Sequence, residues 1–339
     1  MQSRDRDKAT RRYYLAYFQN IFDNIAESEL PLSANDFYFN LEKIVQESPP
    51  KFGNLLPFFL IEKTGRDLRK TLSEMGIEVP KCVSGGLPVG GNGSALIRAN
   101  ESEFIIAIDE KMLMFEFLLS KIFSRLMTQN EAATDGIEFV MAPDSSFKKI
   151  YTENSHQEAF LHALNSTIRG TEKFNPEKIE LTAAQRPLAA SLSESLASFM
   201  LAREYGRALQ KKRKFSKQEI SGVDTEIAVN SQADDFQADC FGVQVLLFSG
   251  TRDDLDLSLS LWCVPIYLYT CELLARMGDN PESASEAISK RLENIRVNSV
   301  ESFENADLAE VWKKVFDLCC EFGKLQLYLW EKIRDKNPG

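Results

Sequence analysis

The segment that most constrains the fold is Leu192–Leu209, where basic residues interrupt an apolar helical face. At about 100° per residue, Arg203 and Arg207 fall on the same face of the expected helix. The apolar members of that face are Leu192, Leu196, Phe199 and Met200. Because a buried charge is costly unless it is paired, arginines on such a face require anionic partners.

A second segment offers the anions. Gln232–Phe248 is predicted to be a helix, and Asp235 and Asp239 stand four residues apart on the face that also carries Val243 and Leu246. Two carboxylates therefore extend another apolar face. The sequence predicts that two cations on one helix pair with two anions on the other.

The two segments resemble the zinc-binding motifs of a peptidase family. The sequence AREYGRAL is similar to the zinc helix HExxH, with Arg203 and Arg207 in place of both histidines and the glutamate retained as Glu204. About thirty residues further on, DFQAD resembles the ExxAD motif of gluzincin-type metallopeptidases. The resemblance places Asp235 where the third zinc ligand would be. It places Asp239 where a carboxylate would orient a zinc-binding histidine.

A third similarity lies downstream, in Pro281–Arg296, which resembles the HP…RL…I stretch of several cytoplasmic families of this type but lacks its histidine. Over roughly Ala95–Arg296 the order of motifs is most similar to that of the phage-exclusion (Lit-like) peptidases and related defence-associated peptidases. This resemblance implies a zincin-like domain, with a role in bacterial phage defence.

The residues that replace the histidines cannot bind zinc. Arginine has no acceptor lone pair and keeps its proton, whereas zinc requires neutral imidazole, thiolate or carboxylate ligands. The chain has only two histidines, His156 and His162, and their six-residue spacing does not form an HxxxH pair. We therefore expect neither a metal nor a cofactor. Instead, we expect the guanidinium groups to fill the place of the metal by hydrogen bonding to the carboxylates.

Three functions remain open at this point. The first is a pseudopeptidase that has no catalytic residues and binds a protein or peptide. The second is a hydrolase without metal, in which Glu204, Asp235 and Asp239 act as acid or base while Arg203 and Arg207 bind an anionic substrate. The third is a structural helical interaction protein, in which Glu204 and Arg207 form an ordinary surface pair and the two helices do not touch.

Composition restricts the partners. A formal net charge of −10 argues against nucleic-acid binding, which depends on clustered basic residues. The six cysteines form no CxxC motif and suit a reducing cytoplasm. The charged start, MQSRDRDKATRR, has no apolar core, so we expect no signal peptide. Polar residues and Pro265 interrupt the longest apolar stretch, Leu255–Tyr269, so we expect a buried helix and no membrane association.

The expected fold class is α+β and mainly helical. We predict a helical region at 1–80, a flexible glycine-rich connection at 81–94, and a zincin-like domain with a small sheet and a helical C-terminal extension at 95–339. The N-terminal helices are predicted at 9–27, 35–47 and 55–75, and the strands at 95–98, 103–108 and 137–141.

The rest of the chain is predicted to be helical apart from one connection. Phe215–Ser231 is polar and contains Gly222, which indicates a mobile connection. The segment HQEAFLHALN is predicted to be a short helix, with both histidines as ordinary polar residues and not as ligands. The remaining helices are predicted at 111–127, 182–212, 257–277, 282–296 and 306–334.

Overall fold

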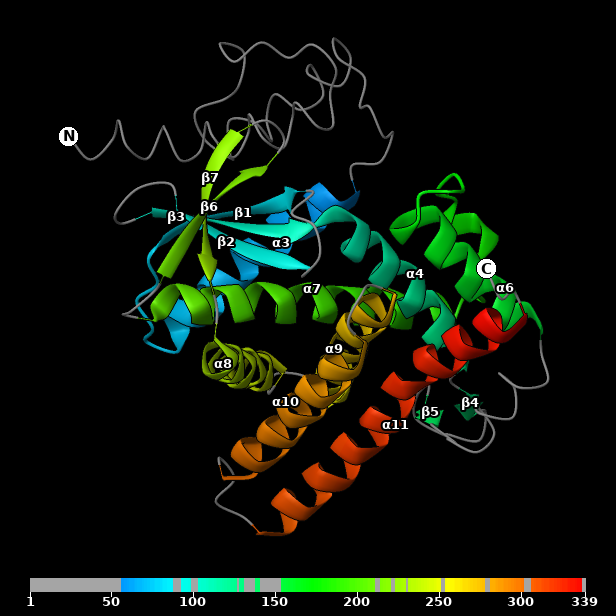
Figure 1. Ribbon diagram of the computed structural model, residues 1–339. Helices are drawn as coiled ribbons and strands as arrows, with labels where there is room; N and C mark the ends of the chain where they lie inside the picture. Colours follow the sequence, from blue (N-terminus) through cyan, green and yellow to red (C-terminus); the bar gives the residue numbers. More distant parts are fainter. Residues whose placement is uncertain are drawn as a thin grey trace. The chain divides into compact units, whose positions relative to one another are not determined.

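The computed structural model describes residues 56–336 except 88–92, 99–102, 127, 131–137, 141–153, 211–213, 221–222, 230, 251–253, 278–280 and 302–305. The helices predicted at 9–27 and 35–47 lie outside the described residues. The fold is α+β and mainly helical, as predicted (Figure 1). Across the described ranges, no helix is both long and apolar enough to span a membrane.

The chain divides into two compact units, each made of two separate segments. One unit contains Met1–Leu113 and Met200–Val245, and the other contains Met114–Phe199 and Leu246–Gly339. This division differs from the expected one at 1–80, 81–94 and 95–339. The unit boundaries fall within helices and not at the glycine-rich stretch.

The first unit contains a five-stranded mixed sheet with the order β1-β3-β2-β7-β6. The strands are β1 (Lys81–Leu87), β2 (Ser94–Arg98), β3 (Glu103–Asp109), β6 (Lys214–Ile220) and β7 (Val223–Val229). The strands predicted at 95–98 and 103–108 are confirmed as β2 and β3, and they pair antiparallel, with Ile97 opposite Ile105. Strand β1 runs parallel to β3, and β2 runs antiparallel to β7.

Two segments predicted as connections are strands. The glycine-rich prediction at 81–94 is wrong for Lys81–Leu87, because β1 pairs with β3 along its whole length. Phe215–Ser231 contains most of the β6–β7 hairpin instead of a mobile connection. A ring contact helps to fix that hairpin: Phe215 stacks on Phe104, with 6.3 Å between ring centroids. The backbone pairing of these polar strands comes from their sheet neighbours, which local composition does not reveal.

Strand β3 is buried on both faces. Phe104, Ile106 and Ile108 are at most 5% exposed, and Ile105 and Ala107, on the opposite face, are at most 3% exposed. A strand that is covered on both faces has apolar residues at successive positions and not only at every second one. This buried strand forms the centre of the core of the first unit.

Four of the helices predicted from the sequence are confirmed. They are α3 (Leu56–Glu74), α4 (Glu110–Leu126), α7 (Gln185–Leu209) and α8 (Gln232–Gly250). At the start of α8, Ser231 and Asp234 cap each other: the Ser231 amide donates to Asp234 Oδ2 and the Asp234 amide donates to Ser231 Oγ. The amide of Ser231 lowers the pKa of Asp234 below its usual range.

The second unit is built mainly of helices. Besides the small β4–β5 ladder (Thr128–Asn130 and Glu138–Val140), it contains α6 (Asn154–Ala163), α9 (Asp254–Arg276), α10 (Pro281–Glu301) and α11 (Ala306–Lys336). Helix α11 packs along α9 and also contacts α10 and α6. Figure 1 shows α9, α10 and α11 as neighbours in the yellow-to-red part of the chain. Aromatic contacts such as Trp262 on Phe322 fill the space between them.

A buried charge cluster as the candidate site

The C-terminal half of α7 is buried around its whole circumference. Every residue from Met200 to Ala208 is buried, including both arginines and the glutamate. Arg203 is 1% exposed and Glu204 is 0% exposed. The sequence predicted one buried face, but all faces are covered. The charges of α7 must therefore be neutralised inside the protein.

Arg203 pairs with the carboxylates of α8. Its Nε donates a hydrogen bond to Asp239 Oδ1 at 2.5 Å, and its Nη2 lies 3.7 Å from Asp235 Oδ1. Asp239 is 0% exposed, so this is a fully buried ion pair. The predicted pairing of an α7 arginine with an α8 aspartate is confirmed here.

Arg207 joins two carboxylates. Its Nη1 donates to Glu204 Oε1, one turn back on the same helix, and its Nη2 donates to Asp235 Oδ1. The Arg207 side chain is 8% exposed and that of Asp235 is 28% exposed. Asp235 is therefore the most solvent-accessible carboxylate of the cluster. The alternative prediction that Glu204 and Arg207 form an ordinary surface pair is wrong, because both side chains are buried.

The structure adds Ser94, which sequence reasoning missed. Ser94 lies at the start of β2, is 5% exposed, and its Oγ donates to Glu204 Oε1 at 2.7 Å. The second oxygen, Glu204 Oε2, is buried and accepts no hydrogen bond from any described residue. No local sequence signal marks Ser94, because its partner is far away in the chain. The charge cluster thus consists of Ser94, Arg203, Glu204, Arg207, Asp235 and Asp239.

A glycine lets the two helices approach closely. A Cβ atom at Gly206 would lie 2.9 Å from Cδ1 and 3.0 Å from Cβ of Phe241. No larger residue fits at position 206 without moving the α8 side chain. This close packing brings the arginines of α7 within hydrogen-bonding distance of the aspartates of α8.

The chemistry of the charge cluster differs from that of a metal centre. Guanidinium N–H groups occupy the positions between the carboxylates, and they offer donors where a cation needs acceptors. Among the residues that the structure describes, no three side chains of His, Cys, Asp or Glu form a group able to hold a metal ion. The residues present do not fit zinc.

The other sequence features lie in the second unit. Pro281–Arg296, the third similarity, forms most of α10. His156 and His162 lie in α6, as predicted, and both are buried, at 3% and 4% exposed. Their interpretation as ordinary polar residues and not ligands stays a prediction. Tertiary packing buries them, and the short amphipathic segment gave no sign of it.

Comparison with known proteins found no match among protein-family models, curated proteins or solved structures.

Proposed function

We propose that this chain is a pseudopeptidase: a zincin-like scaffold without catalytic activity that binds a protein or peptide. The observation that carries the proposal is the buried Arg203–Asp239 pair, because it joins the two segments that resemble HExxH and ExxAD. The arginine stands at the position of a zinc-binding histidine. The aspartate stands at the position of the carboxylate that would orient a histidine.

Two further observations support the proposal. Arg207, at the other histidine position, contacts both Glu204 and Asp235, the positions of the catalytic glutamate and the third ligand. These contacts bring together all five positions that the resemblance assigns to the site. The contrary prediction of a purely structural helical protein, that α7 and α8 do not touch at these motifs, is wrong.

The binding partner that we propose is a polypeptide. The resemblance to peptidases implies a surface that receives an extended chain, and loss of the metal does not by itself remove such a surface. The similarity to phage-exclusion peptidases suggests that this polypeptide is a phage or host component, and that binding regulates a defence response.

The first experiment restores the metal ligands. The triple variant Arg203→His, Arg207→His, Asp235→Glu recreates the full ligand set while leaving Glu204 and Asp239 in place. We expect it to bind about one zinc ion per chain, measured by mass spectrometry of metals, because the backbone geometry of the motifs is retained. The matched control replaces Arg207 with Gln instead of His and should lose most of the affinity.

The outcome is informative provided that the variants fold, which circular dichroism checks. A folded triple variant that binds zinc no better than its control would overturn the ancestry part of the proposal. Stoichiometric zinc in the wild-type protein that is lost on Arg203→Ala would overturn the pseudopeptidase itself.

The second experiment tests binding. Random peptides displayed on phage are selected against the full chain, and the footprint of the enriched peptides is mapped by hydrogen exchange. We expect a footprint on the first unit, at the sheet and its flanking helices. Cleavage of any enriched peptide that disappears in Glu204→Gln would favour the metal-free hydrolase instead. A folded protein that enriches no peptide would contradict the proposed function.

A further inference from the structure

The second unit contains a cavity of about 490 Å³, a volume in the range of small-molecule pockets. Its wall is formed by the end of α4, one face of α6 and the stretch 169–180, which we call the pocket loop. All of these residues lie within Met114–Phe199, so the cavity belongs to one unit. Four of the lining residues of α6 follow the i, i+3, i+4, i+7 spacing of a single helical face: Ser155, Glu158, Ala159 and His162.

Hydrogen bonds hold the pocket loop against the end of α6. The helix continues into one π-helical turn, Leu164–Ile168, a feature often found at functional positions. Within this turn, the main-chain oxygen of Asn165 accepts hydrogen bonds from the amides of Thr171 (2.8 Å) and Glu172 (3.2 Å). Because this wall is already ordered, binding of a ligand against it costs less conformational entropy.

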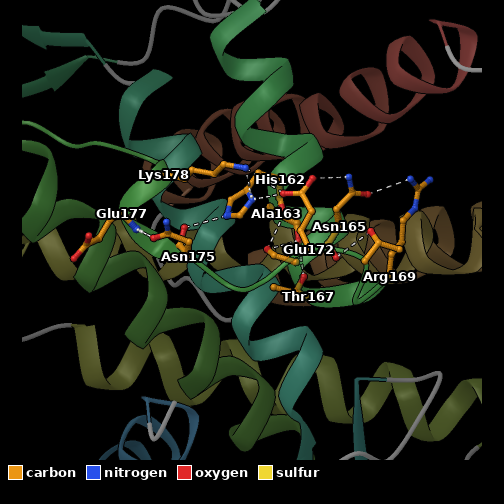
Figure 2. Close-up of polar contacts among 11 residues, drawn as sticks. His162, Ala163, Asn165, Thr167, Arg169, Glu172, Asn175, Glu177 and Lys178 are labelled. Atoms are coloured by element: carbon orange, nitrogen blue, oxygen red, sulfur yellow. Dashed lines mark hydrogen bonds and ion pairs between the residues drawn. The ribbon is translucent and has the colours of Figure 1, made fainter. Parts of the chain in front are cut away.

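Two of the charged groups that line the cavity neutralise each other. Glu172 Oε2 lies 3.2 Å from Lys178 Nζ and 2.9 Å from Nδ1 of the buried His162 ring, as Figure 2 shows. The other oxygen, Glu172 Oε1, accepts a hydrogen bond from Asn165 Nδ2 at 3.1 Å. Nε2 of the same ring lies 3.0 Å from the main-chain oxygen of Asn175. Both oxygens of Glu172 are therefore occupied, and these groups form a polar wall.

Three other charged groups of the lining are left unpaired among the described residues. Arg125 comes from the last turn of α4, Glu158 from α6 and Glu180 from the pocket loop. None of them forms an ion pair or a hydrogen bond with any described residue, although they line the same cavity. Opposite charges held apart in this way can each be matched by a group of a ligand that lies between them. Together they present one positive and two negative charges to the cavity.

These charges disfavour several kinds of ligand. A phosphate or another polyanion would meet Arg125 but also three carboxylates, including that of Glu172. An apolar molecule would separate three charged groups from water and offer none of them a partner. Nowhere in the described part of the chain do three His, Cys, Asp or Glu side chains form a group that could hold a metal ion. The lining favours a ligand that carries charges of both signs, with positive charge in excess.

We propose that this cavity binds a small molecule with one carboxylate and two cationic groups, the charge pattern of a free basic α-amino acid. Arg125 binds the carboxylate, because the N–H groups of its planar guanidinium match the two carboxylate oxygens. Glu158 and Glu180 bind the α-ammonium group and the side-chain cation. This inference goes beyond the proposed function and does not depend on it.

The uncharged part of the lining suits the rest of such a molecule. Ala159, which is 7% exposed, and Leu161 contribute apolar surface beside the charged groups. The methylene stem of a basic amino acid covers apolar surface of this kind while its charged ends reach polar partners. The cavity thus offers a contact to each part of the proposed ligand.

Calorimetric titration of the full chain with L-ornithine, L-lysine and L-arginine tests the proposal, since the three carry the same charges on stems of different length. At neutral pH and low salt, we expect at least one of them to bind once per chain with a Kd of about 1 mM or tighter. Three analogues of the best binder each lack one charge: the decarboxylated amine, the Nα-acetyl derivative, and the derivative with a neutral side chain. Each should bind about tenfold more weakly or worse, because one charge-assisted hydrogen bond is lost. Absence of saturable binding by all three amino acids would overturn the proposal, and so would analogues that bind as well as the parent compound.

Single variants assign each charge of the ligand to a residue. Glu158→Gln and Glu180→Gln should each weaken binding of the amino acid about tenfold. Arg125→Gln should weaken it by a similar factor but should not weaken binding of the decarboxylated amine, which has no carboxylate to lose. The matched control is Glu177→Gln, because Glu177 is an exposed carboxylate of the pocket loop that is not among the described residues lining the cavity.

The control variant should bind as the wild type does. Glu158 and Glu180 are exposed and Arg125 is half-buried, so all of these variants should fold, which circular dichroism checks. Equal losses in Glu177→Gln and Glu158→Gln would overturn the proposed site. An Arg125→Gln variant that loses the amino acid and its decarboxylated analogue to the same extent would overturn the assignment of the carboxylate, and the proposal with it.

Discussion

Arg203 is the residue whose loss should harm the first unit most. It is almost wholly buried, and it is the residue that pairs with the equally buried Asp239. We expect Arg203→Ala to lower the free energy of unfolding by about 3–5 kcal/mol, because it leaves an uncompensated carboxylate in the interior. Urea denaturation followed by circular dichroism measures the loss.

Arg186 provides the matched control for that prediction. It lies on the same helix, α7, but is exposed, so Arg186→Ala should change the stability by less than about 0.5 kcal/mol. The double variant Arg203→Met, Asp239→Leu removes both charges and should recover much of the stability lost in Arg203→Ala. Equal effects of the two single variants would contradict the burial of Arg203.

Glu110 should make stability fall as the pH rises. Burial, and secondarily the charge of Asp109, raise its pKa from 4.5 to about 7. The folded state therefore binds this proton more tightly than the unfolded state, and the associated stability is present below about pH 4.5 and lost as the pH approaches 7. We expect Glu110→Gln to stabilise the protein at pH 8 by up to about 3 kcal/mol and to have little effect at pH 4. Thermal unfolding of both proteins at the two pH values checks the difference, and a stability gain over the wild type that is no larger at pH 8 than at pH 4 would contradict it.

At the scale of elements, the close contact of α7 with α8 depends on Gly206, which has no side chain. Gly206→Ala would ordinarily favour a helix by about 1 kcal/mol. Here the new Cβ meets the Phe241 ring at 2.9 Å, so we expect a net loss of about 1–3 kcal/mol from overpacking. Phe241→Leu in the Gly206→Ala background should recover part of the loss. A stabilising Gly206→Ala, measured by urea denaturation, would show that the helices are further apart.

The elements differ in how far the sequence predicted them. The pairing of Arg203 with Asp239 was predictable, because a cation on an apolar face demands an anion on another. Strand β1 was missed because its glycines, Gly85 and Gly86, are typical of a linker. The β6–β7 hairpin was missed because its polar residues are also typical of a connection. Ser94 and the burial of His162 had no sequence signal, since each depends on groups brought close only by the fold.

At the scale of the whole molecule, the charge cluster combines residues from both segments of the first unit. Ser94 comes from the first segment, and the arginines and aspartates come from the second. Between the two segments lies Met114–Phe199, which belongs to the other unit. Hydrophobic periodicity is local and cannot reveal that organisation. For this reason the elements were largely predictable while the division into units was not.

The discontinuity of the first unit has a consequence for its biosynthesis. Strands β1 to β3 leave the ribosome long before α8, which completes the ion pairs of α7. At about 5–20 residues per second, the early strands wait on the order of ten seconds with an apolar central strand uncovered. A nascent chain in that state is a substrate for chaperones, and a truncation that removes α8 should yield aggregates in place of a smaller folded protein.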